Sequence, residues 1–98
     1  MSPLGYAIEK NDSVMIEALL KRKADVNLKD RESGETALMY AVKSSSSEVV
    51  RVLLDAGAKV NERDKEGRTA LSIAEEDKEN PWRYLIVVEM LKRVGAQR

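Results

Sequence analysis

Two stretches of the chain, 14–21 and 49–56, are apolar on nearly every side. Each contains only two polar residues, and these are four positions apart: Glu17 and Lys21 in the first, Arg51 and Asp55 in the second. Residues at this spacing share one stripe of a helix, so the rest of the helix surface stays apolar. Such a helix needs neighbours on both flanks, and the pattern therefore predicts stacked helical units that depend on one another.

The sequence repeats itself with a period near 33 residues. Residues 24–30 recur as 58–64 at an offset of 34, and a third copy begins at Thr69. The third copy holds five additional residues, which fall within 75–85. A fixed period of this length is typical of repeat architectures. We expect one domain, 1–98, made of three repeats at about 2–35, 36–68 and 69–98.

Polar residues at the edges of the apolar runs predict two short helices in each repeat. Thr36 and Thr69 precede good helix formers and are suited to accept a hydrogen bond from a free backbone amide of the first turn. The serine run 44–47, followed by Glu48, indicates a capped restart of the chain, which we favour over a phosphorylation site. Gly57 is placed to end the second helix in a left-handed conformation.

The first and third copies differ from the second at their outer positions. Lys92 stands where the first two copies have Leu20 and Leu54, so the face that would meet a following repeat carries a charge. We therefore expect the array to end there. The chain begins at Ser2 in the place of the capping threonine, so the first copy is expected to lack a preceding hairpin.

These residues together resemble the ankyrin repeat. The resemblance rests on Thr-x-Leu-x-x-Ala, an apolar Val-Leu-Leu helix and Gly-Ala-x-Val-Asn-x-x-Asp at the period given above. It implies an all-α ankyrin-repeat solenoid, in which antiparallel helix pairs stack and are joined by hairpin-like turns. The sequence departs from the family where Gly5, Met39 and Ser72 replace a common histidine and where Lys23 replaces the capping glycine; we expect these to cost stability and keep the fold.

The resemblance also implies that the chain binds a partner protein. Two complete hairpin turns, called finger 1 (27–35) and finger 2 (60–68) below, would bind it together with the concave face of the first helices. The alternative interpretation of each charged residue there is an ordinary solvated side chain. The candidate partner-binding residues are Lys29, Arg31, Glu32, Glu35, Lys43, Ser44, Arg63, Lys65, Glu66, Arg68, Glu76, Asp77 and, from the insertion, Trp82.

Composition gives no support to other classes of partner. Seventeen Lys and Arg balance seventeen Asp and Glu with the signs interspersed, so we expect no nucleic-acid or membrane partner. There is no long apolar run and no signal-peptide pattern, and cysteine is absent, which is compatible with a reducing compartment. An intracellular, cytoplasmic location is the default expectation. Weak self-association through the incomplete first repeat is the alternative to partner binding.

The residue types also argue against an enzyme. With no His and no Cys, the chain lacks the usual general base, the common nucleophile pairs and the standard zinc ligands. The acidic cluster at 75–79 lacks the spacing of a calcium loop and is interpreted as a solvated helix end. The glycines form neither a dinucleotide fingerprint nor a phosphate loop. We expect no catalytic residue, no metal and no cofactor.

Two further features allow more than one interpretation. Trp82 and Tyr84 have no counterpart in the other repeats and could anchor a partner, but Asn80 followed by Pro81 is a good helix start, and we favour a role for the segment over the end of the stack. Tyr6 and Tyr40 occupy equivalent positions and are expected in the core. By resemblance, Asn27 and Asn61 lie where some ankyrin repeats are hydroxylated; we favour hairpin closure by hydrogen bonds to the local backbone.

Overall fold

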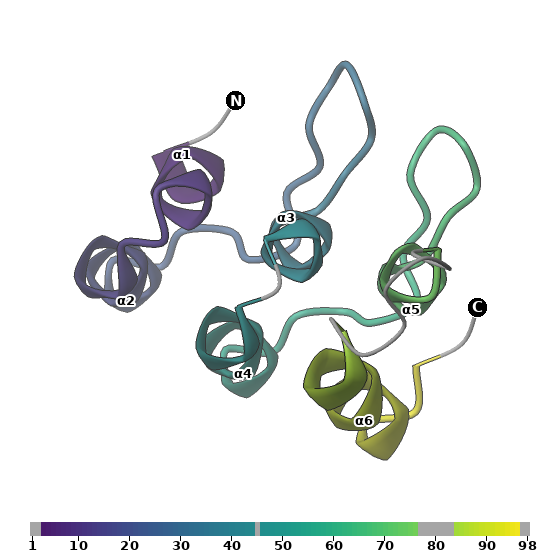
Figure 1. Cartoon of the computed structure of the whole chain (residues 1–98). Coiled ribbons are helices and arrows are strands. Elements are labelled where there is room, and N and C mark those ends of the chain that lie inside the picture. Colours follow the sequence, from purple (N-terminus) through teal and green to yellow (C-terminus); the bar gives the residue numbers. More distant parts are fainter. Residues whose placement is uncertain (1–2, 45, 77–83, 97–98) are drawn as a thin grey trace.

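The computed structural model describes residues 3–44, 46–76 and 84–96. All regular structure in these residues is α-helical (Figure 1). In chain order the helices are α1 (Pro3–Glu9), α2 (Ser13–Lys21), α3 (Ala37–Lys43), α4 (Ser47–Asp55), α5 (Ala70–Ala74) and α6 (Leu85–Arg93). The prediction of an all-α repeat fold is confirmed.

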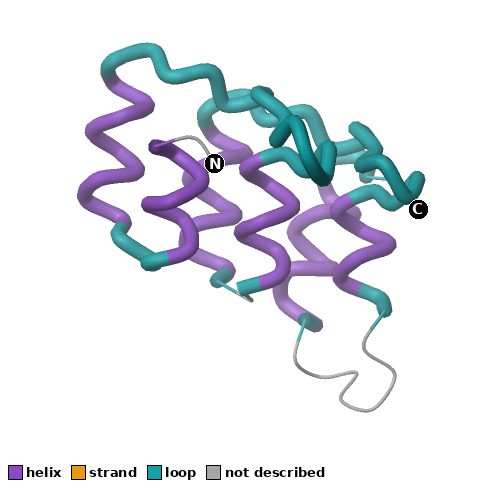
Figure 2. The backbone as a smooth tube through the Cα atoms, turned by 90° about the horizontal axis from the view of Figure 1, so that it is seen from above, coloured by secondary structure: helices purple, strands orange, loops and turns teal. Residues whose placement is uncertain are grey.

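The helices form two layers. One layer contains the first helices of the repeats, α1, α3 and α5, and the other contains the second helices, α2, α4 and α6 (Figure 1). Within a repeat the first helix packs on the second, and between repeats α1 packs on α3, α3 on α5, and α4 on α6. The molecule measures 36 × 25 × 23 Å. Loops gather along one edge of the stack, and Figure 2 shows them beyond the ends of the helices.

Side-chain caps start the helices as the polar pattern predicted. The hydroxyl oxygens of Thr36 and Thr69 accept from the third backbone amide of α3 and α5, at 3.3 Å from Met39 and 3.2 Å from Ser72. Ser46 does the same for α4, with 3.3 Å between its Oγ and the nitrogen of Val49. Ser72 also accepts from the amide of Thr69 at 2.7 Å. The serine that departs from the family pattern therefore completes a reciprocal cap.

A left-handed residue ends the second helix of every repeat. The φ angles of Lys23, Gly57 and Gly95 are 64°, 91° and 82°, and each residue donates its backbone N–H back into the helix that it ends. The next residue in each case, Ala24, Ala58 or Ala96, donates to the carbonyl five positions earlier at 3.0–3.1 Å. This is the Schellman arrangement. Glycine adopts it without strain, whereas Lys23 has a Cβ that opposes it.

The core lies between the two layers. Its largest fully buried side chains come from all three repeats, and the aliphatic ones are Ile8, Ile16, Leu38, Met39, Val42, Val49, Val50, Leu53, Val87 and Leu91. Because helices from neighbouring repeats share this core, no repeat buries its apolar face alone.

The expectation that Tyr6 and Tyr40 both lie in the core was wrong for Tyr6. Tyr6 is 52% exposed, and the Lys10 ammonium lies 5.7 Å from the centre of its ring. Tyr40 is half-buried, and its hydroxyl donates to Asp30 Oδ2 at 2.8 Å. The difference arises because α3 has a helix pair on both sides, whereas no described residue covers the outer side of α1.

The outer side of α2 is uncovered for the same reason, although the sequence predicted neighbours on both flanks. Val14 is 77% exposed and Met15 is 43% exposed. Val49, which occupies the position of Met15 in the second repeat, is 2% exposed. A partly open apolar face therefore remains at the α1–α2 end of the molecule.

Candidate functional site

Finger 1 and finger 2 stand side by side on the same edge of the stack (Figure 1). Each is closed at its base by an aspartate. The amide of Asp30 donates to the carbonyl of Glu35 at 2.8 Å, and the amide of Asp64 donates to the carbonyl of Arg68 at 3.0 Å. The carboxylates of the same two aspartates accept from backbone amides inside the turn, including those of Glu32 at 2.8 Å and Glu66 at 2.9 Å. The aspartates therefore hold the fingers in shape.

Both aspartates are held in the charged form. The hydrogen bond from the Tyr40 hydroxyl lowers the pKa of Asp30. Burial and the bond to Asp30 raise the pKa of Tyr40 to about 12. Burial acts to raise the pKa of Asp64, but the hydrogen bonds from the Arg68 backbone and side chain outweigh it and leave that pKa below its ordinary value. These acids serve the finger bases as carboxylates and are not proton donors near neutral pH.

The two fingers are also bonded to each other. Lys29 Nζ donates to the carbonyl of Arg63 at 2.9 Å. The amide of Lys65 donates to the carbonyl of Ser33 at 3.0 Å, and its ammonium donates to the carbonyl of Arg31. These bonds join segments 34 or 32 residues apart in the sequence, so the fingers behave as one platform and not as two independent loops.

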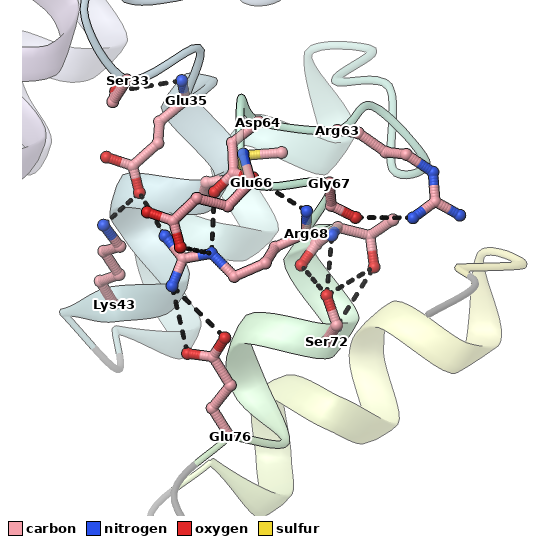
Figure 3. Close-up of polar contacts among 12 residues, drawn as sticks. Ser33, Glu35, Lys43, Arg63, Asp64, Glu66, Gly67, Arg68, Ser72 and Glu76 are labelled. Carbon is pink, nitrogen blue, oxygen red and sulfur yellow. Dashed lines mark hydrogen bonds and ion pairs between the residues drawn. The ribbon is translucent and has the colours of Figure 1, made fainter.

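Arg68 forms the centre of a charged cluster at the base of finger 2 (Figure 3). Its Nε lies 2.9 Å from Asp64 Oδ2 and 3.7 Å from Glu66 Oε2. Its two terminal nitrogens lie 3.3 Å from Glu76 Oε2 and 4.0 Å from Glu35 Oε2. The carboxylate of Asp64 raises the pKa of Arg68, so the guanidinium stays charged.

Glu35 was expected among exposed partner-binding charges, but the structure buries it. Its side chain is 7% exposed and pairs with Lys43 of α3 and with Arg68. The buried Oε2 atom accepts no hydrogen bond of ordinary geometry, and its charge is balanced by the two cations. A buried carboxylate needs such compensation. Glu35 and Arg68 therefore join finger 1, finger 2 and α3, and offer little surface to a partner.

The other candidate residues fall into groups according to their side-chain contacts. Lys29, Lys65 and Arg63 are exposed but use their side chains within the finger platform. Lys43 and Glu76 are exposed and belong to the charged cluster. Ser44 donates to the carbonyl of Ala41 at 2.9 Å. The remaining described candidates are Arg31, Glu32 and Glu66, which are exposed.

Arg31 and Glu32 differ from the rest, because neither side chain has a hydrogen bond or ion pair with any described residue. Glu66 lies 3.7 Å from Arg68 and its side chain is 74% exposed. Asp77 and Trp82 lie outside the described residues, as do Asn80 and the proline after it.

Asn27 closes no local hairpin bond through its side chain. Its Oδ1 accepts from the amide of Lys59 at 2.7 Å, so it joins the first repeat to the second. Asn61 Nδ2 donates in the same direction, to the carbonyl of Gly95 at 3.4 Å. The preference for a local bond at Asn27 was therefore wrong, because the stacking of repeats brings the next turn within reach.

The sequence interpretation did not assign a role to Asp30, Asp64 or Tyr40. The signal for the aspartates was present, because both end the repeated Val-Asn-x-x-Asp segment. An aspartate at the start of a turn commonly accepts from backbone amides two residues on. The contact of Tyr40 with Asp30 had no such signal, because it depends on how finger 1 sits over α3.

The described residues offer little for chemistry. Among them, no group of three or more Asp, Glu, His or Cys side chains is arranged to hold a metal ion. No helix within the described ranges has the length and apolar character that crossing a membrane requires.

Comparisons with known proteins agree with this architecture. A family model for ankyrin repeats matches residues 4–96 as three copies. The crystal structure of the ankyrin repeat domain of Bcl-3, a unique member of the IkappaB protein family, is 32% identical and superposes with a TM-score of 0.87. The match covers 99% of this chain and 40% of that one. A comparison with curated proteins found no match. Because 435 chains of known structure match, likeness to one of them does not identify a partner.

Proposed function

Because the chain belongs to the ankyrin-repeat family, we propose that it binds a partner protein through the finger platform and the adjoining ends of α3 and α5. Ankyrin repeats are generally protein-interaction modules, and the family is typically non-enzymatic. The observation that carries the proposal is the platform itself. Its polar groups are largely consumed in joining finger 1 to finger 2, while Arg31, Glu32 and Glu66 remain exposed.

A rigid platform suits recognition because little conformational entropy is lost when a partner docks on it. The exposed charges are of mixed sign and carry no net excess. Such charges contribute modestly to affinity, since exposed pairs are worth about 0–1 kcal/mol and are screened by salt. They favour orientation and association rate instead. We therefore expect capture of the partner to weaken with rising salt.

Charge reversal tests the proposal. The triple variant Arg31→Glu, Glu32→Lys and Glu66→Lys should lose the partner that the unaltered chain cross-links in native lysate, while its melting temperature stays unchanged. Lys65 is best left intact, because its ammonium and amide bond finger 1 to finger 2.

The matched control reverses three exposed charges on the second-helix layer: Glu17→Lys, Arg51→Glu and Glu89→Lys. It changes the net charge by the same amount on the opposite side of the molecule. Undiminished capture by the finger variant, or equal loss in the control, would move the binding surface away from the fingers.

Self-association is a second candidate function, and the open α1–α2 face favours it. Tyr6, Val14 and Met15 are 52%, 77% and 43% exposed. Burial of apolar surface drives association at about 25 cal/mol per Å² before the costs of docking. A second copy on this face predicts a concentration-dependent dimer in sedimentation equilibrium that Met15→Glu abolishes. A strictly monomeric species at high concentration would remove this candidate.

A further inference from the structure

Finger 1 is bonded to finger 2 along one edge only. The groups that finger 1 contributes come from residues 27, 29, 31 and 33: the amide oxygen of Asn27, the ammonium of Lys29 and the carbonyls of Arg31 and Ser33. A spacing of two residues is that of one edge of an extended chain. The fingers thus pair in the manner of neighbouring extended strands, with side chains completing the pattern.

The opposite edge of finger 1 has the same groups as the matching edge of finger 2, but without a neighbour. Finger 2 meets finger 1 through the amides of Lys59 and Lys65 and the carbonyl of Arg63. The equivalent positions, 34 residues earlier, are Asp25, Arg31 and Lys29.

In the described ranges the amides of Asp25 and Arg31 and the carbonyl of Lys29 make no hydrogen bond. Because backbone polar groups are strong and obligatory hydrogen-bonding groups, an edge that leaves them open to solvent is a template for another extended segment.

One side chain on this free edge differs in character from its counterpart. Glu62 of finger 2 faces finger 1, and its Oε1 lies 3.7 Å from Lys29 Nζ. The equivalent residue of finger 1 is Leu28, which is 55% exposed. Leu28 lines a pocket of about 570 Å³ together with Leu4 of α1 and Tyr40 of α3. The bound edge therefore has an ion pair where the free edge has an apolar contact surface.

We propose that this free edge binds an extended segment of the partner protein, with an apolar side chain of that segment seated on Leu28, Leu4 and Tyr40. The proposal rests on the function proposed above and names the chemistry of the partner. The internal interface supplies the pattern. A carbonyl of the segment accepts from the Arg31 amide and a second one from the Arg31 guanidinium, as Ser33 and Arg31 accept from Lys65. Binding by addition of an extended segment to an open edge is a general mode of peptide recognition.

The same pattern argues against a second copy of this chain as the occupant. The position that would meet Leu28 is Lys29 in finger 1 and Arg63 in finger 2, both cations. A charged head placed against Leu28 would lose water without gaining a partner. The segment that fits therefore carries an apolar residue where this chain's own fingers carry Lys29 and Arg63.

Two peptides test the proposal directly. Both have the sequence of residues 24–36, one unchanged and one carrying Lys29→Leu. Titrated into the isotope-labelled chain, the Lys29→Leu peptide should bind at least tenfold more tightly than the unchanged peptide. Its backbone amide shifts should centre on Asp25, Leu28 and Arg31. The variant Leu28→Glu restores the residue of finger 2 and should reverse the preference, so that the unchanged peptide binds more tightly.

Ile86→Glu serves as the matched control, because Ile86 is 66% exposed on α6 and lies outside the pocket. It should leave the preference between the peptides as it is. Binding of neither peptide, amide shifts on another surface, or a preference that Leu28→Glu does not alter would each overturn the proposal. A dimer of the unaltered chain that Leu28→Glu abolishes would assign the edge to a second copy and would overturn it as well.

Failure here is distinguishable from failure of the proposed function. If the partner depends on Glu32 and Glu66 but binds Leu28→Glu and the unaltered chain equally, the finger platform is the binding surface and the free edge is not part of it. If capture responds neither to the charge reversals nor to Leu28→Glu, both proposals fall.

Discussion

The left-handed conformation of Lys23 makes a sharp prediction, because two other residues provide an internal reference. Lys23 has a φ of 64° at the position where the second and third repeats have Gly57 and Gly95. All three make the same helix-ending hydrogen bonds. Lys23 is exposed, and its side chain makes no hydrogen bond or ion pair within the described residues. The variant Lys23→Gly therefore changes the backbone preference and little else.

The magnitude follows from two opposing terms. A residue with a Cβ loses roughly 1–2 kcal/mol in the left-handed region. Glycine removes this strain but gives the unfolded chain more freedom, which costs about 0.4–1 kcal/mol. The balance predicts that Lys23→Gly raises the free energy of unfolding by about 0.5–1 kcal/mol. In a domain of this size, 1 kcal/mol corresponds to a melting-temperature change of about 4–8 °C.

Urea unfolding followed by circular dichroism, with thermal melts beside it, measures the change. Lys23→Ala is the matched control, because alanine keeps the Cβ and removes only the exposed side chain; it should change stability by less than about 0.5 kcal/mol. Gly57→Lys should lower stability by about as much as Lys23→Gly raises it, since a Cβ at Gly57 meets nothing within 4 Å and only backbone strain is introduced. An unchanged or lower unfolding free energy for Lys23→Gly would refute the reasoning.

Three further predictions concern the caps, the finger base and the core. Thr69→Ala removes the cap of α5 and should cost about 1 kcal/mol in chemical denaturation, whereas Thr69→Ser should retain most of the stability; equal losses would contradict the capping role. The pKa of Asp64 is lowered from 3.8 on folding, so its stabilisation is complete above that value and is lost as the pH falls through the lower folded-state pKa. Unfolding free energies measured from about pH 5 to pH 2 should therefore fall less steeply in Asp64→Asn than in the unaltered chain, and identical slopes would argue against the assignment. Leu53→Ala, at a fully buried site, should cost about 2–5 kcal/mol, while Ile86→Ala, at a 66% exposed site, should stay within about 0.5 kcal/mol; similar effects would contradict the packing described.

Much of the fold could be predicted from local signals. The capping threonines, the left-handed Gly57 and the apolar second helices are each specified by residues a few positions apart. Hydrogen bonds inside one turn and the 3.6-residue period of a helix act over that range. The repeat period then placed finger 1 and finger 2 in the sequence.

The candidate site was predicted less completely. Arg31 and Glu32 are exposed on finger 1, as expected, but Glu35 from the same finger is buried between Lys43 and Arg68. All four charges look alike in the sequence. Their different burial follows from which face of the finger meets α3 and finger 2, and partners 8 and 33 residues distant are not visible in a local pattern.

The sequence by itself determined the repeat period, the helices with their caps and the positions of the fingers, because these depend on short-range periodicity and hydrogen bonding. Only the tertiary structure decided what each repeat position contacts. Tyr6 and Tyr40 are the same residue at the same repeat position, yet one is exposed and the other bonds Asp30. Leu28 and Glu62 likewise share a position, and only one faces a neighbouring finger. A repeat sequence specifies equivalent surfaces, and the order of stacking determines which of them are covered.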